Sequence, residues 1–478
     1  MLKMKEYLKK FMDSHSGYAF DFYLAEWQTD FLRFFNSQTN YNITKTTLSL
    51  KATVEKDKKK YSFSLSNPSE KEVEEALKEG MALLPTLPAD SDFAGFEDNK
   101  DLFSYPDMSS SLEKVPAEKK IEILTALSEM AGRYDFGIYG TFITLLIHGY
   151  KMNSTGLDKE VFVSPVMLDV KGVSRKNMVT VIHSYGGNDL AHFDLASFSG
   201  ELEAKIKRAT LDIVDVEPGE YTVILGPHAA GELLRYLMFA SYAATVDRGS
   251  SYFKGKLNEK VFPDIFSVIS DPLHPQLITV PYNEDGHIAR RLPLVEKGVF
   301  KNFVVNHYYA NKLKMEKNGS VGLAAMVLDK GTMSLEEMIK SIDRGLYISN
   351  IHYMNFINQQ ETSVTGLTRD GTFLIENGEI TKVVNNLRYT EKLAEIFKHT
   401  EALENVQHPV PVSENYGNFE IFSSLIHELS ASLHRGCRGR GCPHHEDRPD
   451  AGRDGCRCAG RRRHQAFQPC RGHLRPAP

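Results

Sequence analysis

The sequence predicts an α+β fold with two domains and a tail. Helical and strand-like segments follow one another without the regular β-α-β alternation that marks a parallel sheet, and several strands are joined by tight turns. The chain has 478 residues, of which 41% are apolar, which is enough for two cores. We therefore expect mixed or antiparallel sheets flanked by helices in an N-terminal domain (1–215), a C-terminal domain (216–426) and an anomalous tail (427–478).

The N-terminal domain is predicted to contain helices and hairpins. Apolar residues at helical spacing predict a helix over about residues 1–35. Two alternating segments, 43–54 and 61–65, are joined by a lysine-rich stretch that we interpret as a solvated hairpin tip. The remaining predicted elements are a capped helix over 69–83, helices over 116–130 and 193–213, and strands over 136–150, 160–170 and 177–184, with Gly186-Gly187 as a turn.

The C-terminal domain is organised around residues 221–246. A short β-branched strand, 221–225, is followed by the Gly226-Pro227 break, and proline is favoured in a first helical turn. From Ala229 onward the apolar spacing predicts a helix that continues to the end of the segment. Further predicted elements are hairpins at 294–300 and 374–380, helices at 334–344 and 389–398, and an extended stretch from His408 to Pro411.

Composition and charge narrow the function class. The net charge is −5, and the residues before His427 carry a balance of −11, so the body is acidic. Duplex nucleic acid is bound by lysine and arginine, which argues against nucleic acid as a direct partner. The lysine-rich start lacks an apolar signal core, and no apolar run is long enough to cross a membrane. We expect a cytoplasmic protein without a membrane partner.

The tail differs from the rest of the chain. All five cysteines lie in the last 42 residues, among arginine, glycine, histidine and proline, and no apolar period is present. We interpret residues 427–478 as disordered or translated out of frame. The alternative is a metal site built from the tail's cysteines and histidines, although their spacing matches no established zinc signature.

The segment 221–246, together with 250–272, 281–313 and 371–384, resembles the TldD/PmbA family, also called modulators of DNA gyrase. The resemblance implies a two-domain α+β fold of that family. In the TldD branch, a His-Glu-x-x-x-His motif on the helix after the Gly-Pro turn binds zinc and makes the subunit a metallopeptidase. The corresponding positions here are Arg235, Tyr236 and Ala240, none of which is a competent zinc ligand or base.

The resemblance is therefore closer to the PmbA branch, also called TldE, which lacks the motif. It implies a non-catalytic subunit of a cytoplasmic zinc metallopeptidase that acts on unfolded peptides or small proteins, with no metal in this chain and zinc in a TldD-like partner. The chain would form a heterodimer with that partner or a homodimer. Two alternatives stay open, namely a metallopeptidase in its own right with unrecognised ligands and a non-proteolytic regulatory protein.

The predicted substrate groove rests on two turns. Gly226, Pro227 and His228 stand at the helix start, where free backbone N–H groups bind an anion or a peptide carbonyl. Asp285 and Gly286 match a turn of the family. A capping or packing role for His228 and a plain turn at Asp285 are the simpler interpretations.

Overall fold

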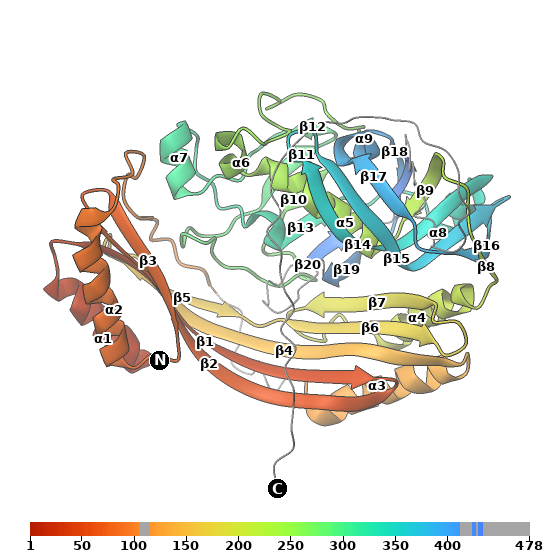
Figure 1. The fold of residues 1–478 in the computed structure, drawn as a ribbon, viewed down its shortest axis with the longest axis horizontal. Helices are drawn as coiled ribbons and strands as arrows, with labels where there is room; N and C mark the ends of the chain where they lie inside the picture. Colours follow the sequence, from red (N-terminus) through yellow and green to blue (C-terminus); the bar gives the residue numbers. More distant parts are fainter. Residues whose placement is uncertain (105–114, 412–422, 427–428, 434–478) are drawn as a thin grey trace, which may run out of the picture. The chain divides into compact units, whose positions relative to one another are not determined.

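The structure is a computed structural model that describes residues 1–104, 115–411, 423–426 and 429–433, the last two segments by their backbone. All of these residues belong to one compact unit. Three sheets form its framework (Figure 1). Mixed sheets with flanking helices confirm the α+β class.

The first sheet is built from the N-terminal half in the order β3-β2-β1-β4-β6-β7, and β5 pairs with β4. Long antiparallel ladders hold it together; one example is Phe22, which pairs with Ala52 on one side and Met152 on the other. The strands are β1 (Ala19–Phe35), β2 (Gln38–Lys56), β3 (Lys59–Ser66), β4 (Phe136–Asn153), β5 (Asp158–Val163), β6 (Val166–Ser174) and β7 (Thr180–Gly187).

Strand β1 corrects the predicted helix over residues 1–35. Only α1 (Leu2–Ser14) is helical. Phe20, Phe22 and Leu24 are fully buried on one face of β1, so the pattern has a period of two. Aromatic residues at spacings of three and four are compatible with a helix as well as with a strand. Residues 19–35 form a strand because they pair with the two long neighbouring strands β2 and β4.

Helices cover this sheet in two places. Helix α1 buries Leu8 against β1, and helix α2 (Glu70–Leu83) packs on β2 and β3 and buries Leu77 in the same cluster. Ser69 caps α2 through a capping box with Glu72, as the predicted capped helix requires. Helices α3 (Ala117–Gly132) and α4 (Leu195–Ala209) cover the other cluster of the sheet, in which Leu127 and Leu202 are fully buried.

The other two sheets come mostly from the C-terminal half. The second has the order β12-β11-β10-β13-β20-β19, and the third has the order β18-β21-β9-β14-β15-β16-β8, with β17 paired to β15. Their strands are β8 (Ile213–Val214), β9 (Tyr221–Leu225), β10 (Val268–Ser270), β11 (Leu292–Glu296), β12 (Val299–Phe300), β13 (Ala325–Leu328), β14 (Arg344–Asn358), β15 (Ser363–Glu376), β16 (Glu379–Val384), β17 (Arg388–Lys392), β18 (Thr400–Leu403), β19 (His408–Pro411), β20 (Ser423–Ile426) and β21 (Leu429–Leu433).

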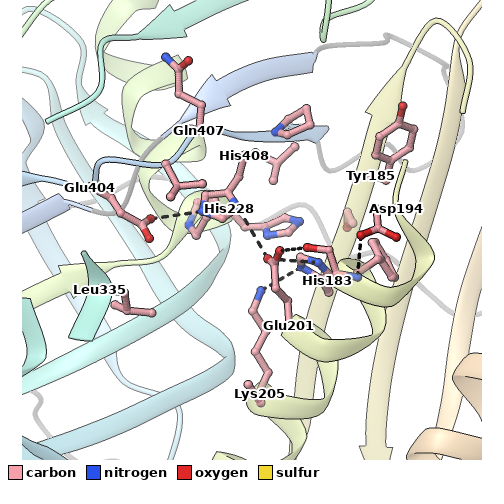
Figure 2. Close-up of a pocket in the computed structure, with 18 of the residues that line it drawn as sticks. His183, Tyr185, Asp194, Glu201, Lys205, His228, Leu335, Glu404, Gln407 and His408 are labelled. Atoms are coloured by element: carbon pink, nitrogen blue, oxygen red, sulfur yellow. Dashed lines mark hydrogen bonds and ion pairs between the residues drawn. The ribbon is translucent and has the colours of Figure 1, made fainter. Parts of the chain in front are cut away.

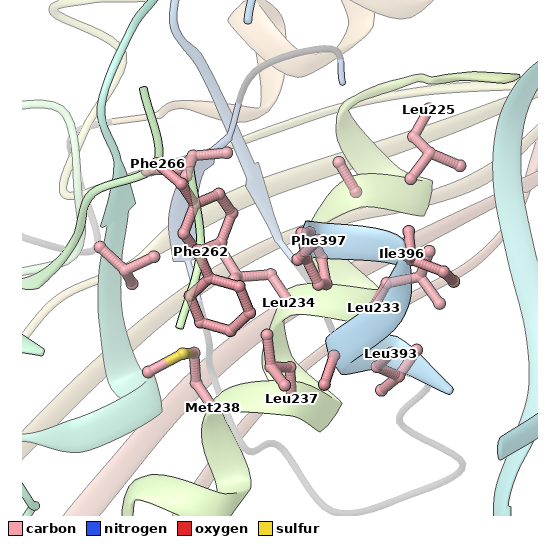
Figure 3. Close-up of a cluster of buried hydrophobic side chains, with 14 of the residues drawn as sticks. Leu225, Leu233, Leu234, Leu237, Met238, Phe262, Phe266, Leu393, Ile396 and Phe397 are labelled. Carbon is pink, nitrogen blue, oxygen red and sulfur yellow. The ribbon is translucent and has the colours of Figure 1, made fainter. Parts of the chain in front are cut away.

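The largest core surrounds helix α5 (Pro227–Met238), which is buried on nearly every side. Leu233, Leu234 and Leu237 are almost fully buried and meet Phe266 and Phe397 (Figure 3). A helix that is apolar around most of its circumference belongs in the interior of a large domain. The shorter helical elements are η1 (Leu84–Thr86), η2 (Phe239–Ser241), α6 (Ala243–Asp247), α7 (His307–Leu313), η3 (Gly322–Ala324), α8 (Leu335–Lys340) and α9 (Leu393–Lys398).

Both predicted hairpins are confirmed. In the second, Asn377 and Gly378 have φ angles of 51° and 78° between β15 and β16, as a tight turn requires. In the first, Lys297 and Gly298 occupy the turn between β11 and β12. A Cβ atom on Gly298 would lie 2.0 Å from the carbonyl oxygen of Phe262, so only glycine fits there.

Several predicted boundaries were wrong. The strand predicted at 160–170 is two strands, because Ser164-Pro165 interrupts it, and the predicted turn at Gly186-Gly187 belongs to β7. Residues 388–392 form strand β17 before α9 begins. Residues 429–433, which we assigned to the disordered tail, form strand β21 between β9 and β18. The remainder of the tail from residue 434, and with it the predicted metal site, lies outside the described residues.

The division at residue 215 stays a prediction. One hydrophobic cluster joins side chains of both halves, among them Ile123, Ile206, Tyr347 and Phe373. Within the described residues, no helix is long and apolar enough to span a membrane.

Candidate functional site

The junction of β9 and α5 positions the site. Strand β9 is central in its sheet, between β21 and β14, and the Gly226 N–H donates to the carbonyl oxygen of Ile348 over 2.8 Å. A Cβ atom on Gly226 would lie 2.8 Å from the hydroxyl of Tyr347, so glycine allows this close approach. Pro227 then begins the helix, where its missing N–H has no cost. Helix α5 has no side-chain cap.

His228 lines a cavity of about 480 Å³ beside this junction. Strand β7 supplies His183, helix α4 supplies Glu201, and the chain entering β19 supplies Glu404 and His408 (Figure 2). Glu201 Oε2 lies 3.5 Å from His183 Nε2 and 3.7 Å from His408 Nδ1, and His408 Nε2 lies 3.2 Å from Glu404 Oε2. Imidazoles and carboxylates from four separate segments therefore meet in one cavity.

Burial keeps two of these imidazoles neutral. It lowers the pKa of His228 to about 3 and that of His183 well below its usual value, and the nearby Lys205 charge adds to both effects. Lys205 Nζ donates to His183 Nδ1 over 3.2 Å and to the carbonyl oxygen of Ile182 over 3.1 Å. The remaining proton of His183 is therefore on Nε2, facing Glu201.

This tautomer bears on metal binding. A histidine that ligates a metal normally donates its second ring N–H to an acceptor, whereas Lys205 is a donor. His183 is consequently a hydrogen-bond donor toward the cavity rather than a metal ligand. Both ring nitrogens of the 6% exposed His228 lack hydrogen-bond partners among the described residues. The cavity is lined by carboxylates, such as those of Glu201 and Glu404, and by the ammonium group of Lys205.

The three positions that match the zinc motif lie at the other end of α5 and in η2, which follows it. Arg235 makes a bidentate ion pair with Glu232, with Nη2–Oε1 and Nε–Oε2 distances of 2.7 and 3.0 Å. The Tyr236 hydroxyl donates to the carbonyl oxygen of Met354 over 2.6 Å. Ala240 is 5% exposed. None of these side chains can bind a zinc ion. Arg235 is a cation, the Tyr236 hydroxyl is hydrogen-bonded to a carbonyl oxygen, and Ala240 has no ligand atom.

Arg235 and Tyr236 are the two residues of α5 that are not buried, and the Arg235 side chain is 24% exposed and paired. The sequence expectation for the end of this helix was wrong. The helix was expected to continue to residue 246, but α5 ends at Met238 and Ala240 lies in η2. The chain leaves the helix because Ser241 and Ala243 exchange backbone hydrogen bonds with Val304.

An apolar surface adjoins the motif positions. The Phe356 ring lies 4.9 Å from that of Tyr236 and 6.4 Å from that of Phe239. Phe239 is 36% exposed, and Tyr353 and Ile357 on β14 are exposed by more than half. The Tyr236, Phe239 and Phe356 rings therefore form one aromatic cluster at the end of α5, and Tyr353 and Ile357 are exposed on the strand that carries Phe356.

Asp285 and Gly286 do not line the cavity at His228. They form a turn in which Asp285 Oδ2 accepts the backbone N–H of His307 over 2.8 Å and Gly286 has a φ angle of 92°. Burial raises the pKa of Asp285. The two predicted halves of the groove are therefore separate places. His183, Glu201, Glu404 and His408 were missed, because no motif links positions so distant in sequence.

Comparisons with known proteins agree with this fold. Residues 218–431 match the family model described as the PmbA/TldA metallopeptidase C-terminal domain. The chain is 26% identical over 215 residues to the metalloprotease PmbA homolog of Haemophilus influenzae, covering 44% of this chain and 47% of that protein. It is 28% identical over 259 residues to the zinc metalloprotease TldD homolog of Saccharolobus solfataricus, covering 48% of this chain and 55% of that protein.

The structural comparison covers more of the chain. The crystal structure of TldE from Thermococcus kodakarensis superposes with a TM-score of 0.78 at 18% sequence identity, over 90% of this chain and 99% of that one. This likeness shows the fold. By sequence, the chain spans about half the length of the curated relatives it matches.

Proposed function

Because this chain belongs to the TldD/PmbA family, we propose that it acts as a non-catalytic, PmbA/TldE-like subunit of a metallopeptidase, with a TldD-like subunit that holds the zinc. Its named relatives are metalloproteases, and both branches of the family are among them. The proposal concerns which part of such an enzyme this chain supplies.

The observation that carries the proposal is which side chains occupy the zinc-motif positions on and just after α5, and what they bind. In the TldD branch this helix supplies zinc ligands and a base, whereas here the matching positions hold the Arg235–Glu232 ion pair, a tyrosine bonded to Met354 and the buried Ala240. An arginine paired in this way places a fixed positive charge where a zinc ion would need ligands. Among the described residues, α5 carries no group of three metal-ligating side chains.

The apolar surface formed by the Tyr236, Phe239 and Phe356 rings, with the exposed Tyr353 and Ile357 on the same strand as Phe356, supports a role in substrate binding. It borders the motif positions through Tyr236, so a peptide lying on it would pass the end of α5. An extended, unfolded peptide gains main-chain hydrogen bonds at a sheet edge and side-chain contacts at such a surface. In this proposal Gly226, Pro227 and His228 form a second contact region at the cavity.

The test is reconstitution. Cleavage of an unfolded peptide is measured for this chain alone, for a TldD-like subunit from the same source alone, and for their mixture, with size-exclusion chromatography to detect a complex. The proposal predicts a mixed complex that cleaves faster than either subunit. Cleavage by this chain alone would show a peptidase with other ligands, and a complex without any gain in cleavage would show a regulatory protein.

A variant pair separates substrate binding from chemistry. Tyr353→Ser and Ile357→Ser remove exposed apolar contacts, so the mixture should show a higher KM with a similar kcat. The control is Leu102→Ser, an exposed apolar residue away from this surface, which should leave both constants unchanged. Equal effects of the three substitutions would remove the apolar surface from the proposal.

A further inference from the structure

A buried carboxylate meets two imidazoles at a place remote in sequence from α5. Glu97 lies in the loop after η1, and its side chain is 1% exposed. His287 Nδ1 and His307 Nδ1 lie 3.5 and 3.6 Å from the same oxygen, Glu97 Oε2. The side chains of the two histidines are only 13% and 16% exposed.

The two oxygens of Glu97 have different surroundings. Oε1 accepts hydrogen bonds from Lys317 Nζ (2.7 Å) and from the backbone N–H groups of Asp98 (3.0 Å) and Asn99 (2.8 Å). Oε2 is buried and has no hydrogen-bond partner among the described residues.

Both imidazoles are placed by local structure. Asn283 Oδ1 accepts the backbone N–H of His287 over 2.9 Å in the turn that contains Gly286. His307 is the first residue of α7, whose cap is Asn306, and its backbone N–H is held by Asp285. Nδ1 of His287 and both ring nitrogens of His307 are buried without hydrogen-bond partners among the described residues.

The spacing of these atoms differs from that of a hydrogen-bonded network. N–H···O bonds have lengths of about 2.7–3.2 Å, and contacts of 3.5 and 3.6 Å are longer. Ligands about 2.0–2.2 Å from a tetrahedral zinc ion are separated from one another by roughly 3.3–3.6 Å. Asp98 adds a second carboxylate, since ligand atoms of Glu97, Asp98 and His307 all lie within 4.8 Å of one another.

We propose that Glu97, Asp98 and His307, with His287 beside Glu97 Oε2, bind a divalent transition-metal ion such as Zn²⁺. Two imidazoles and a carboxylate favour zinc, iron or another first-row metal over Ca²⁺ or Mg²⁺, which take oxygen ligands. Lys317 holds Glu97 through Oε1, which orients Oε2 toward the ion and resembles the hydrogen bonding of ligating carboxylates in other metal sites.

The ion would connect distant parts of the chain. Glu97 belongs to the N-terminal half, whereas His287 lies in a turn and His307 begins α7 in the C-terminal half. Because Glu97 and His307 are largely buried, the ion would fix the loop of Glu97 to the start of α7. The inference is independent of the proposed peptidase subunit, because the site uses none of the α5 residues.

The test counts metal in the full-length chain with the five tail cysteines changed to serine, so that thiolates do not compete. Equilibrium dialysis against Zn²⁺ is followed by elemental analysis for this background and for Glu97→Gln, His287→Gln and His307→Gln. The control is His399→Gln, a partly buried histidine whose Nδ1 contacts the carbonyl oxygen of Glu395. The tail histidines are the same in every variant and cancel in the comparison.

The background and the control should each retain one more tightly held zinc than the three ligand variants, whose affinity for this ion should fall by at least about 100-fold. Zn²⁺ should also raise the melting temperature of the background and the control more than that of the variants. Equal zinc content and equal thermal shifts in the control and in His307→Gln would overturn the site. If Glu97→Gln does not fold, the two histidine variants decide the question.

Discussion

The ion pair between Arg235 and Glu232 gives the sharpest test of how α5 is used. The Glu232 side chain is 9% exposed and that of Arg235 is 24% exposed, and two hydrogen bonds of 2.7 and 3.0 Å join them. Removing one partner of a buried pair costs about 3–5 kcal/mol, because the other charge is left without compensation. Since Arg235 is partly exposed, we expect Arg235→Met to cost about 3 kcal/mol.

A double-mutant cycle measures the pair itself. Urea unfolding is measured for wild type, Arg235→Met, Glu232→Gln and the double variant. The free energies of unfolding are compared under the condition that the slope of free energy against urea concentration is the same for all four. The two charge-assisted hydrogen bonds, discounted for exposure, predict a coupling energy of about 2 kcal/mol. A loss below about 0.5 kcal/mol for Arg235→Met would refute the structural role, and Arg235 would then be free to act on a ligand.

Three further changes test the surrounding structure. Burial raises the pKa of Glu391 to about 8, so the folded chain holds this proton more tightly than the unfolded chain does. The free energy of unfolding therefore falls as the pH rises from about 4 to 8. At pH 9, Glu391→Gln should be more stable than wild type by about 2 kcal/mol in urea unfolding. Leu237→Ala, in the core around α5, should cost about 2–5 kcal/mol in the same assay, and a smaller loss would show a loosely packed core. Gly298→Ala places a methyl group 2.0 Å from the Phe262 carbonyl oxygen and should lower the free energy of unfolding by more than about 2 kcal/mol. The control, Gly255→Ala, is also at positive φ but in open space and should lower it by about 1 kcal/mol. Equal losses for the two variants would contradict the steric argument.

Local signals predicted part of the fold well. Asn377-Gly378 specifies a tight turn through its own backbone preferences, and Ser69 with Glu72 specifies a helix start through two hydrogen bonds. Neither signal needs a distant partner. For this reason the hairpins and the capped helix were predicted within a few residues.

Elements that depend on distant partners were predicted poorly. The apolar residues of β1 fit either a helix or a strand, and only the ladders to β2 and β4 settle the choice. Helix α5 ends early because Val304 binds the backbone of Ser241 and Ala243. No sequence window contains both partners, so the helix pattern was extended too far.

The candidate sites show the same limit. His228 was chosen from its place after the Gly-Pro turn, and the structure puts it in a cavity, but His183 and His408 reach that cavity from strands far away in sequence. Asp285 lies in a turn, as the match to the family predicted, and its role in a substrate groove stays a prediction. Its neighbours Glu97 and His307 become visible only when the chain is folded.

The most direct test of the central claim uses an inactive partner. A TldD-like subunit whose motif glutamate is changed to glutamine is mixed with this chain, and cleavage of an unfolded peptide is compared with that of the wild-type mixture. If the chain is a non-catalytic subunit, the mixture with the inactive partner forms the same complex and has no activity. Cleavage that persists in that mixture would place the catalytic groups in this chain and contradict the account.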